Sequence, residues 1–343
     1  MIRIAAVAAL VLAVAAHAGT GSTPPLERLV GQKIMTGIDG AAPDAALLAR
    51  VRAGEVGGVI LFGRNTPSSA QVASTIAELQ AAAKAGGNPP LLIATDQEGG
   101  LVKRLPGPPD LAPAAIDSAA KARSEGAATG AYLHRLGIDV DLAPVLDTPY
   151  GPASWLGTRA FSRDARLNAS LGPAFVAGLQ SAGVAATAKH FPGLGTARAT
   201  TDTADVVLTT SKQALNAGLR PFRAAIDDGV DLVMVSNAGY TALDPTGAPA
   251  VLSRPIVVGL LRGQLGFHGV VISDAMEAPG PSTRPAAPLT ASAIGVDVLL
   301  YTSEATSEAA YSKLLAAARA GFVPRSALVS SWSRIQVLKQ RLA

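Results

Sequence analysis

The chain has 343 residues, no cysteine, four histidines and a formal net charge of +4 at pH 7. The absence of cysteine excludes disulfides, a thiol nucleophile, cysteine-ligated zinc and iron–sulfur clusters. A hydrophobic fraction of 49% excludes global disorder, and the few charged residues form no Lys/Arg-rich cluster, which argues against nucleic-acid binding.

The N-terminal segment has the pattern of a secretion signal. Arg3 precedes an apolar run that ends in Ala16-His17-Ala18, a small-x-small cleavage site before Gly19. The run of about 13 residues is shorter than the ~20 that a bilayer span needs. We therefore expect a signal peptide at residues 1–18, a flexible leader at 19–25 and one domain at 26–343. The predicted location is secreted or periplasmic, without stable membrane insertion.

Predicted strands and helices alternate along the rest of the chain. Short apolar runs predict strands at residues 56–62, 91–95, 140–145, 184–188, 232–235, 270–273 and 296–301. Amphipathic stretches predict helices at 69–83, 167–182, 211–227 and 254–265, and a terminal helix pair at 307–320 and 325–342. Strands this continuously apolar are buried on both faces, as in a parallel sheet. The pattern suits a (β/α)8 TIM-type barrel or a doubly wound sheet.

The barrel is favoured over the doubly wound sheet because no Gly-x-Gly-x-x-Gly follows the first predicted strand. The expected fold class is thus α/β, a single-domain (β/α)8 barrel. The Pro-rich stretch at residues 278–288 directly follows a predicted strand, and we expect it to be a loop at the top of this barrel rather than a domain boundary.

Polar residues follow almost every predicted strand. They are Asp96-Gln97-Glu98, Asp147, Lys189-His190, Ser236-Asn237 and Asp274. One such residue alone would be read as a helix cap. Because the carboxyl ends of barrel strands meet at one mouth, where active sites lie, this repeated pattern predicts a single polar pocket. Neither a His-x-His nor a His-Glu-x-x-His pair is present, so we expect no metal and no cofactor.

Several segments carry a family resemblance through their shared order and spacing. They are Gly57-Gly58-Val59-Ile60-Leu61-Phe62, Asp96-Gln97-Glu98-Gly99-Gly100 with Arg104, Leu142-Ala143-Pro144-Val145-Leu146-Asp147, Gly157-Thr158-Arg159-Ala160-Phe161, Lys189-His190-Phe191-Pro192-Gly193 and Gly269-Val270-Val271-Ile272-Ser273-Asp274. From about Leu29 to Leu300 the chain resembles glycoside hydrolase family 3, in particular its single-domain β-N-acetylglucosaminidases.

The resemblance implies retaining hydrolysis of a terminal β-linked sugar. Asp274 matches the nucleophile that forms a covalent glycosyl-enzyme. The sugar-holding set is matched by Asp96, Arg104, Arg159, Lys189 and His190. The implied substrate is an N-acetylglucosamine-containing glycan of the cell-wall type, with β-glucosides as the alternative. For Glu98 we expect a structural role, in a salt bridge or a turn.

The family's usual proton carrier is missing. In the resembling enzymes it is a His in an Asp-Ser-His triplet of the loop after Lys-His-Phe-Pro-Gly. Here the triplet reads Asp202-Thr203-Ala204. His17 lies in the signal peptide, His134 on a predicted helix, and His268 before the strand that leads to Asp274, at the opposite end of the barrel.

Three accounts of the missing histidine remain open. In the first, the acid/base is Asp202 or, as the weaker candidate, Asp205. In the second, a carboxylate from a different loop takes this role, for example Glu98 or Glu277. In the third, the protein is a catalytically impaired family member that binds sugar. An unrelated hinged periplasmic-type binder is disfavoured, because there are only two tryptophans and no hinge-like linker.

Overall fold

The computed structural model of the protein describes residues 23–150 and 154–343. The predicted signal peptide and the start of the predicted leader lie outside the described residues. Over the described part of the chain, no helix is both long and apolar enough to cross a bilayer.

Eight parallel strands form one sheet in the order β11-β9-β7-β6-β3-β2-β1-β12. A parallel bridge between Ile272 and Val298 brings the two edges of this sheet together into a nearly closed barrel. The predicted single-domain (β/α)8 barrel is thereby confirmed. The strands are β1 (Ile34–Gly37), β2 (Gly58–Leu61), β3 (Leu92–Thr95), β6 (Val140–Asp141), β7 (Ala185–Phe191), β9 (Leu232–Val235), β11 (Val270–Ser273) and β12 (Leu299–Leu300).

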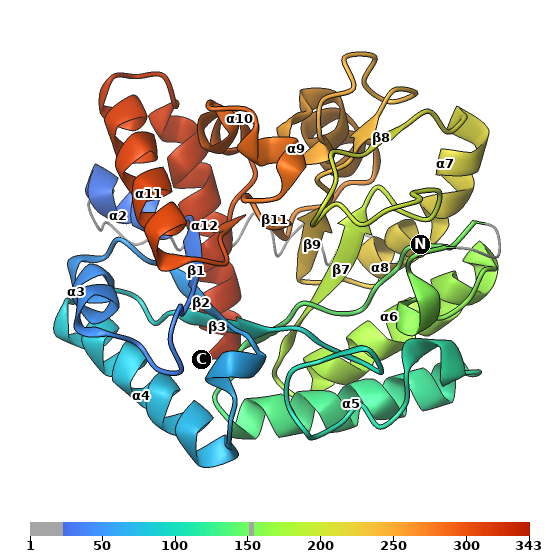
Figure 1. Cartoon of the computed structure of the whole chain (residues 1–343), viewed down its shortest axis with the longest axis horizontal. Coiled ribbons are helices and arrows are strands. Elements are labelled where there is room, and N and C mark those ends of the chain that lie inside the picture. Colours follow the sequence, from blue (N-terminus) through green and yellow to red (C-terminus); the bar gives the residue numbers. More distant parts are fainter. Residues whose placement is uncertain (1–22, 151–153) are drawn as a thin grey trace, which may run out of the picture.

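Helical segments surround the barrel (Figure 1); all but α2, which precedes β1, come after a barrel strand in the chain. They are α2 (Leu26–Gly31), α3 (Ala45–Ala53), α4 (Ser69–Ala85), α5 (Ala119–Arg135), α6 (Ala165–Ser181), α7 (Lys212–Gly218), α8 (Arg220–Asp227), the π-type helix η5 (Pro255–Gln264), α9 (Pro279–Ser282), α10 (Ala287–Ala293), α11 (Glu304–Arg319) and α12 (Arg325–Leu342). Asp44, Ser68 and Ser118 each accept a backbone N–H of the following first turn, which fixes where α3, α4 and α5 begin.

Two short two-stranded sheets stand beside the barrel. The strands β4 (Gln97–Gly99) and β5 (Val102–Lys103) pair antiparallel directly after β3. The strands β8 (Val207–Leu208) and β10 (Gly239–Tyr240) pair in parallel after β7 and β9. Both sheets follow the carboxyl ends of barrel strands and so order the loops on that face.

The structure differs from the sequence prediction in several element bounds. Strand β1 was not predicted, because its apolar pair Ile34-Met35 is followed by Thr36-Gly37 and carries little strand signal. Strand β7 runs to Phe191 and therefore contains Lys189-His190, which we expected just beyond the strand. The single helix predicted at 211–227 is two helices, α7 and α8, and Pro221 lies in the first turn of the second.

Helix α12 covers the amino-terminal end of the barrel. Its Ile335 and Leu338 belong to the apolar cluster that fills the barrel interior. Its Lys339 donates to the carbonyl of Gly57, which directly precedes β2. With this end covered, the polar residues at the carboxyl ends of the strands face the opposite, accessible end.

Candidate active site

A cavity of about 240 Å³ lies where the carboxyl ends of the barrel strands meet. Its walls include the matched nucleophile, the five matched sugar-binding residues and one candidate acid/base: Asp96, Arg104, Arg159, Lys189, His190, Asp202 and Asp274. The other named acid/base candidates, Asp205, Glu98 and Glu277, are absent from the lining. Polar residues that follow different predicted strands in the sequence therefore converge on one cavity in the fold.

Two aromatic residues of the cavity wall were missed by the sequence reasoning. Phe62 and Trp155 both line the cavity. Phe62 directly follows β2, and residues at the carboxyl ends of barrel strands are expected at the cavity. Phe62 was missed because only polar residues at these positions were considered. Trp155 lies in the loop before Gly157 and carried no such signal. The guanidinium of Arg159 lies 5.5 Å from the centre of the Trp155 ring, a cation–π distance.

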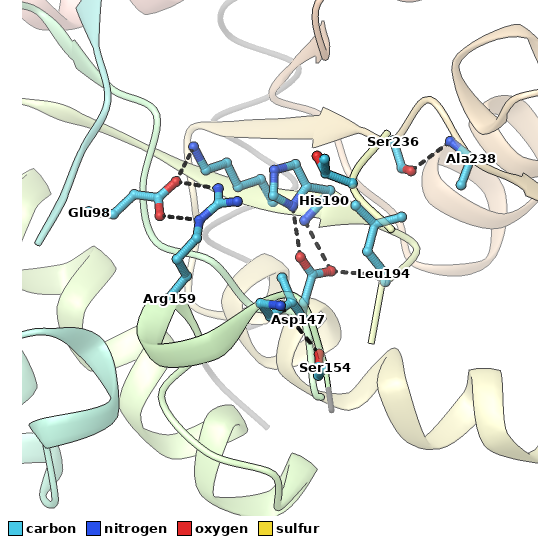
Figure 2. A network of polar contacts seen from close by, with 12 residues as sticks. Glu98, Asp147, Ser154, Arg159, His190, Leu194, Ser236 and Ala238 are labelled. Atoms are coloured by element: carbon cyan, nitrogen blue, oxygen red, sulfur yellow. Dashed lines mark hydrogen bonds and ion pairs between the residues drawn. The ribbon is translucent and has the colours of Figure 1, made fainter. Parts of the chain in front are cut away.

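The first group of cavity residues is an ion-pair network around Lys189 (Figure 2). Its Nζ lies 2.8 Å from Oδ1 of Asp96 and 2.7 Å from Oε1 of Glu98. Arg159 binds the same Glu98 through two hydrogen bonds of 2.8 Å, from Nε and Nη2. Arg104 lies 3.4 Å from the other oxygen of Asp96. Paired carboxylates and cations thus face one another at the base of the cavity.

The network keeps its members charged. Burial alone would raise the pKa of Asp96, but the charges of Lys189 and Arg104 outweigh it and hold that pKa below its usual range. The pKa of Glu98 is likewise lowered: burial raises it, and Lys189 with Arg159 more than reverse the effect. Burial disfavours the charged form of Lys189, but the two carboxylates raise its pKa above the ordinary value.

Glu98 therefore has the structural role that we expected from the sequence. Its side chain is fully buried, ionised and bound on both oxygens by Lys189 and Arg159. A carboxylate held in this way has no proton to donate, which removes Glu98 as the acid/base. It instead fixes the two cations against the cavity.

His190 is oriented by a buried carboxylate beneath it. The Nδ1 of His190 lies 2.7 Å from Oδ2 of Asp147, as Figure 2 shows. Asp147 also accepts the backbone N–H of His190 at 3.3 Å and that of Leu194 at 2.7 Å. The bond to Asp147 occupies Nδ1, so Nε2 is the ring nitrogen of His190 that Asp147 does not engage.

An irregularity in β7 brings Lys189 and His190 to the same cavity. Neighbouring residues of a regular strand point to opposite faces of the sheet. The pairing of β7 with β9 shifts register between Ala188 and Phe191, so the two residues lie where the alternation is broken. Both side chains line the cavity as a result.

Asp274 follows β11 directly and lines the same cavity. Its Oδ1 accepts the N–H of Ala275 at 2.8 Å. Burial raises the pKa of Asp274, His190 acts to lower it, and the negative charge of Asp202 raises it further. Asp202 is thus within electrostatic reach of Asp274, although the two are far apart in the sequence.

Asp202 lies on the loop after β7, at the mouth of the cavity. The hydroxyl of Thr200 donates to Oδ2 of Asp202 at 2.9 Å and accepts its backbone N–H at 3.2 Å. Thr200 and Thr201 line the cavity beside it. Asp205, in contrast, is absent from the cavity lining, and its Oδ2 lies 3.6 Å from Nη1 of Arg284.

The remaining candidates for a proton carrier lie elsewhere. Glu277 is not part of the cavity lining; its Oε1 accepts the N–H groups of Thr302 and Ser303 and the hydroxyl of Thr306. His134 is exposed on α5, and His268 is exposed before the amino-terminal end of β11. Among residues 23–150 and 154–343, no group of three His, Cys, Asp or Glu side chains is placed to hold a metal ion.

Comparison with known proteins gives one consistent result. The model of the glycosyl hydrolase family 3 N-terminal domain matches residues 26–338. A β-hexosaminidase of Xanthomonas oryzae pv. oryzae is 37% identical over 80% of this chain and 86% of its own length. A secreted glycosyl hydrolase of Arthroderma benhamiae, otherwise uncharacterised, is 34% identical over 91% of this chain and 93% of its own.

Solved structures agree with the sequence matches. The family 3 β-N-acetylglucosaminidase of Paenibacillus sp. superposes with a TM-score of 0.89 at 37% identity, over 93% of this chain. This chain spans 63% of the length of that structure. The β-N-acetylhexosaminidase of Beutenbergia cavernae superposes with a TM-score of 0.84 at 35% identity, over 93% of this chain and 100% of its own.

Proposed function

Because the chain belongs to glycosyl hydrolase family 3, we propose that it is an exported, retaining enzyme that removes terminal β-linked N-acetylglucosamine from cell-wall-type glycans. The glycosidase class predicted from the sequence is confirmed by the family match and the β-hexosaminidase relatives. The sugar, the mechanism and the location are the proposal. Export is supported by the N-terminal pattern and by the secreted Arthroderma relative.

One observation carries the mechanism: Asp274 and Asp202 line the same cavity as the charged groups proposed to bind sugar. Retaining glycosidases need two carboxyl groups that flank the scissile bond, one as nucleophile and one as acid/base. Asp274 sits on a strand end, held through its Oδ1 by the N–H of Ala275. Asp202 sits on a loop at the mouth, where a leaving group would depart.

In the first step, protonated Asp202 donates its proton to the glycosidic oxygen while a carboxylate oxygen of Asp274 attacks C1. The bond between C1 and the leaving oxygen breaks, an ester to Asp274 forms, and the aglycone leaves as an alcohol. In the second step, the Asp202 carboxylate takes a proton from water and the water oxygen attacks C1. The ester breaks, Asp274 is regenerated, and the sugar leaves with its original β configuration.

The ion-pair network binds the terminal sugar in this scheme. Asp96 uses remaining lone pairs to accept hydroxyl groups of the sugar in charge-assisted hydrogen bonds. Arg104, Arg159 and Lys189 donate to hydroxyls, and His190 presents Nε2 as its nitrogen not bound to Asp147. Since these groups are already paired and oriented, little side-chain freedom is lost when the sugar binds.

A second candidate function is a sugar-binding protein with little turnover. The observation that favours it is the loop after β7, residues 194–206, which holds no histidine. Loss of general acid catalysis typically costs about 10²–10⁴-fold in rate. The nucleophile Asp274 favours the enzyme, because a pure binder has no need of it.

The deciding experiment is hydrolysis of p-nitrophenyl β-N-acetylglucosaminide. We expect the wild-type protein to release p-nitrophenol and Asp274→Ala to release none. The matched control is Asp228→Ala, which removes an exposed carboxylate at the end of α8 and should leave the rate unchanged. Binding of N-acetylglucosamine without turnover of any aryl β-glycoside would establish the second candidate instead.

A further inference from the structure

We propose that Asp205 and Arg284 are positioning residues, whose ion pair holds the Asp202 loop against the segment that follows Asp274. The proposal rests on the proposed function, since it concerns how the acid/base is placed over the nucleophile. It also gives a role to two features that the mechanism leaves unused, the Pro-rich stretch at 278–288 and the second loop aspartate.

The loop that carries Asp202 is tied down at both ends. At its start, Leu194 N–H binds the buried carboxylate of Asp147, and the carbonyl of Gly195 accepts the N–H of Tyr150 at 2.7 Å. At its end, the loop enters β8, which pairs with β10. The stretch between these anchors carries Asp202, whose residue is exposed to solvent. Asp202 is hydrogen-bonded to Thr200 on the same loop.

Asp205 lies between Asp202 and the β8 anchor and reaches across to another loop. Its Oδ2 is 3.6 Å from Nη1 of Arg284. Arg284 lies on the connection that leaves the barrel after β11 and Asp274. The pair therefore joins the two loops that carry the proposed acid/base and the proposed nucleophile.

Arg284 lies in a conformationally restricted segment. Prolines at 279, 281, 285 and 288 fix the backbone φ angle at four positions around it. Its Nη1 also donates to the carbonyl of Gly280 and to the hydroxyl of Thr283. Thr283 in turn donates to the carbonyl of Pro279 at 3.0 Å. A guanidinium held by its own loop in this way is a fixed point against which Asp205 can be placed.

The expected loss of activity in the variants follows from the solvent exposure of the Asp205 and Arg284 side chains. The two side chains are 37% and 42% exposed, so solvent screens the pair. Exposed pairs contribute about 0.2–1 kcal/mol, which corresponds to at most about fivefold in a rate or equilibrium constant. We therefore expect a modest loss, confined to reactions that need Asp202.

The test compares two substrates in Asp205→Asn, in Arg284→Met and in the charge-exchanged double variant Asp205→Arg with Arg284→Asp. A β-linked N-acetylglucosamine disaccharide has a poor leaving group and needs the acid. The 2,4-dinitrophenyl glycoside leaves without one. Each single variant should lower kcat/KM for the disaccharide about two- to fivefold and leave kcat/KM for the dinitrophenyl glycoside unchanged. The double variant should restore kcat/KM for the disaccharide to the wild-type value. The control is Arg198→Gln, an exposed cation on the same loop.

Equal losses on both substrates, no loss on either, or no restoration in the double variant would overturn the proposal. A wild-type protein that turns over neither substrate would overturn the proposed function instead. In that case amide hydrogen exchange of residues 197–206 decides the proposal by itself. We expect faster exchange in each single variant and wild-type exchange in the double variant; unchanged exchange in the single variants would reject the ion pair as a positioning contact.

Discussion

Buried carboxylates in this cavity differ in charge state because they differ in their neighbours. Asp96 and Glu98 share Lys189 and Arg159, and Asp96 also faces Arg104, so the pKa values of both fall despite burial. For Asp274 the balance is the other way: burial and the negative charge of Asp202 raise its pKa by more than His190, the N–H of Ala275 and Lys189 lower it. The charged form of the carboxylate is thus favoured at Asp96 and Glu98 and disfavoured at Asp274.

The pH dependence of the nucleophile follows from this difference. Asp274 must be ionised to attack C1, so kcat/KM falls as the pH drops through its raised pKa. In Asp202→Asn one of the groups that raise this pKa is neutral, and the acid limb should move to lower pH. The measurement is kcat/KM for the 2,4-dinitrophenyl glycoside across the acid range, because this substrate needs no proton donor.

The control for that shift is Asp228→Asn, whose exposed carboxylate lies at the end of α8, away from the cavity lining. Its acid limb should coincide with that of the wild-type protein. An acid limb in Asp202→Asn that stays where it was would show that Asp202 does not act on Asp274.

At the scale of elements, two segments determine the site: the irregular end of β7, which presents Lys189 and His190 together, and α12, which covers the other end of the barrel. Helix α12 carries a buried cation, Lys339. Lys339 donates to Oε1 of Gln32 at 2.7 Å and to the carbonyl of Gly57 at 3.0 Å. These bonds hold the helix on the barrel, but the ammonium group has been removed from water.

Lys339 makes the free energy of unfolding vary with pH across the alkaline range. Burial lowers its pKa from 10.5 to about 7, with Asp139 as the opposing influence. Between these two values the unfolded chain binds the proton more strongly, so the free energy of unfolding rises with pH. Lys339→Met removes the titration, and its free energy of unfolding relative to the wild-type protein should increase by about 4 kcal/mol as the pH falls from the upper value to the lower.

Urea unfolding at several pH values across this range measures the effect. The matched control is Lys84→Met, an exposed lysine in the last turn of α4, which should follow the wild-type pH dependence. If wild type and Lys339→Met differ by a constant amount at every pH, Lys339 does not titrate in this range.

How well an element could be predicted depends on whether its signal is local. Strands β9 and β11 match their predicted bounds because each holds a compact apolar run, of four residues in β9 and three in β11, that is followed by a serine. Strand β1 was missed because its pairing with β2 and β12 defines it, and both partners are distant in sequence. The register shift in β7 is likewise a property of its pairing with β9, which no local pattern encodes.

For the whole molecule, the barrel itself made most of the site predictable. Residues at the carboxyl ends of parallel strands converge, so a list of strand ends becomes a list of cavity residues. Loop contacts did not follow from this rule: Asp202 reaches the cavity while Asp205, three positions later, turns to Arg284. The sequence left both aspartates open as proton carriers, and only the folded loop separates their surroundings.

The central claim is that Asp202 replaces the missing histidine as acid/base, and rescue of Asp202→Ala by azide tests it most directly. With the 2,4-dinitrophenyl glycoside the variant should still form the ester to Asp274, and azide should restore turnover and yield the β-glycosyl azide, because azide attacks C1 without a base. Disaccharide hydrolysis should fall by about 10²–10⁴-fold. Equal losses on both substrates, with no β-glycosyl azide formed, would contradict the account.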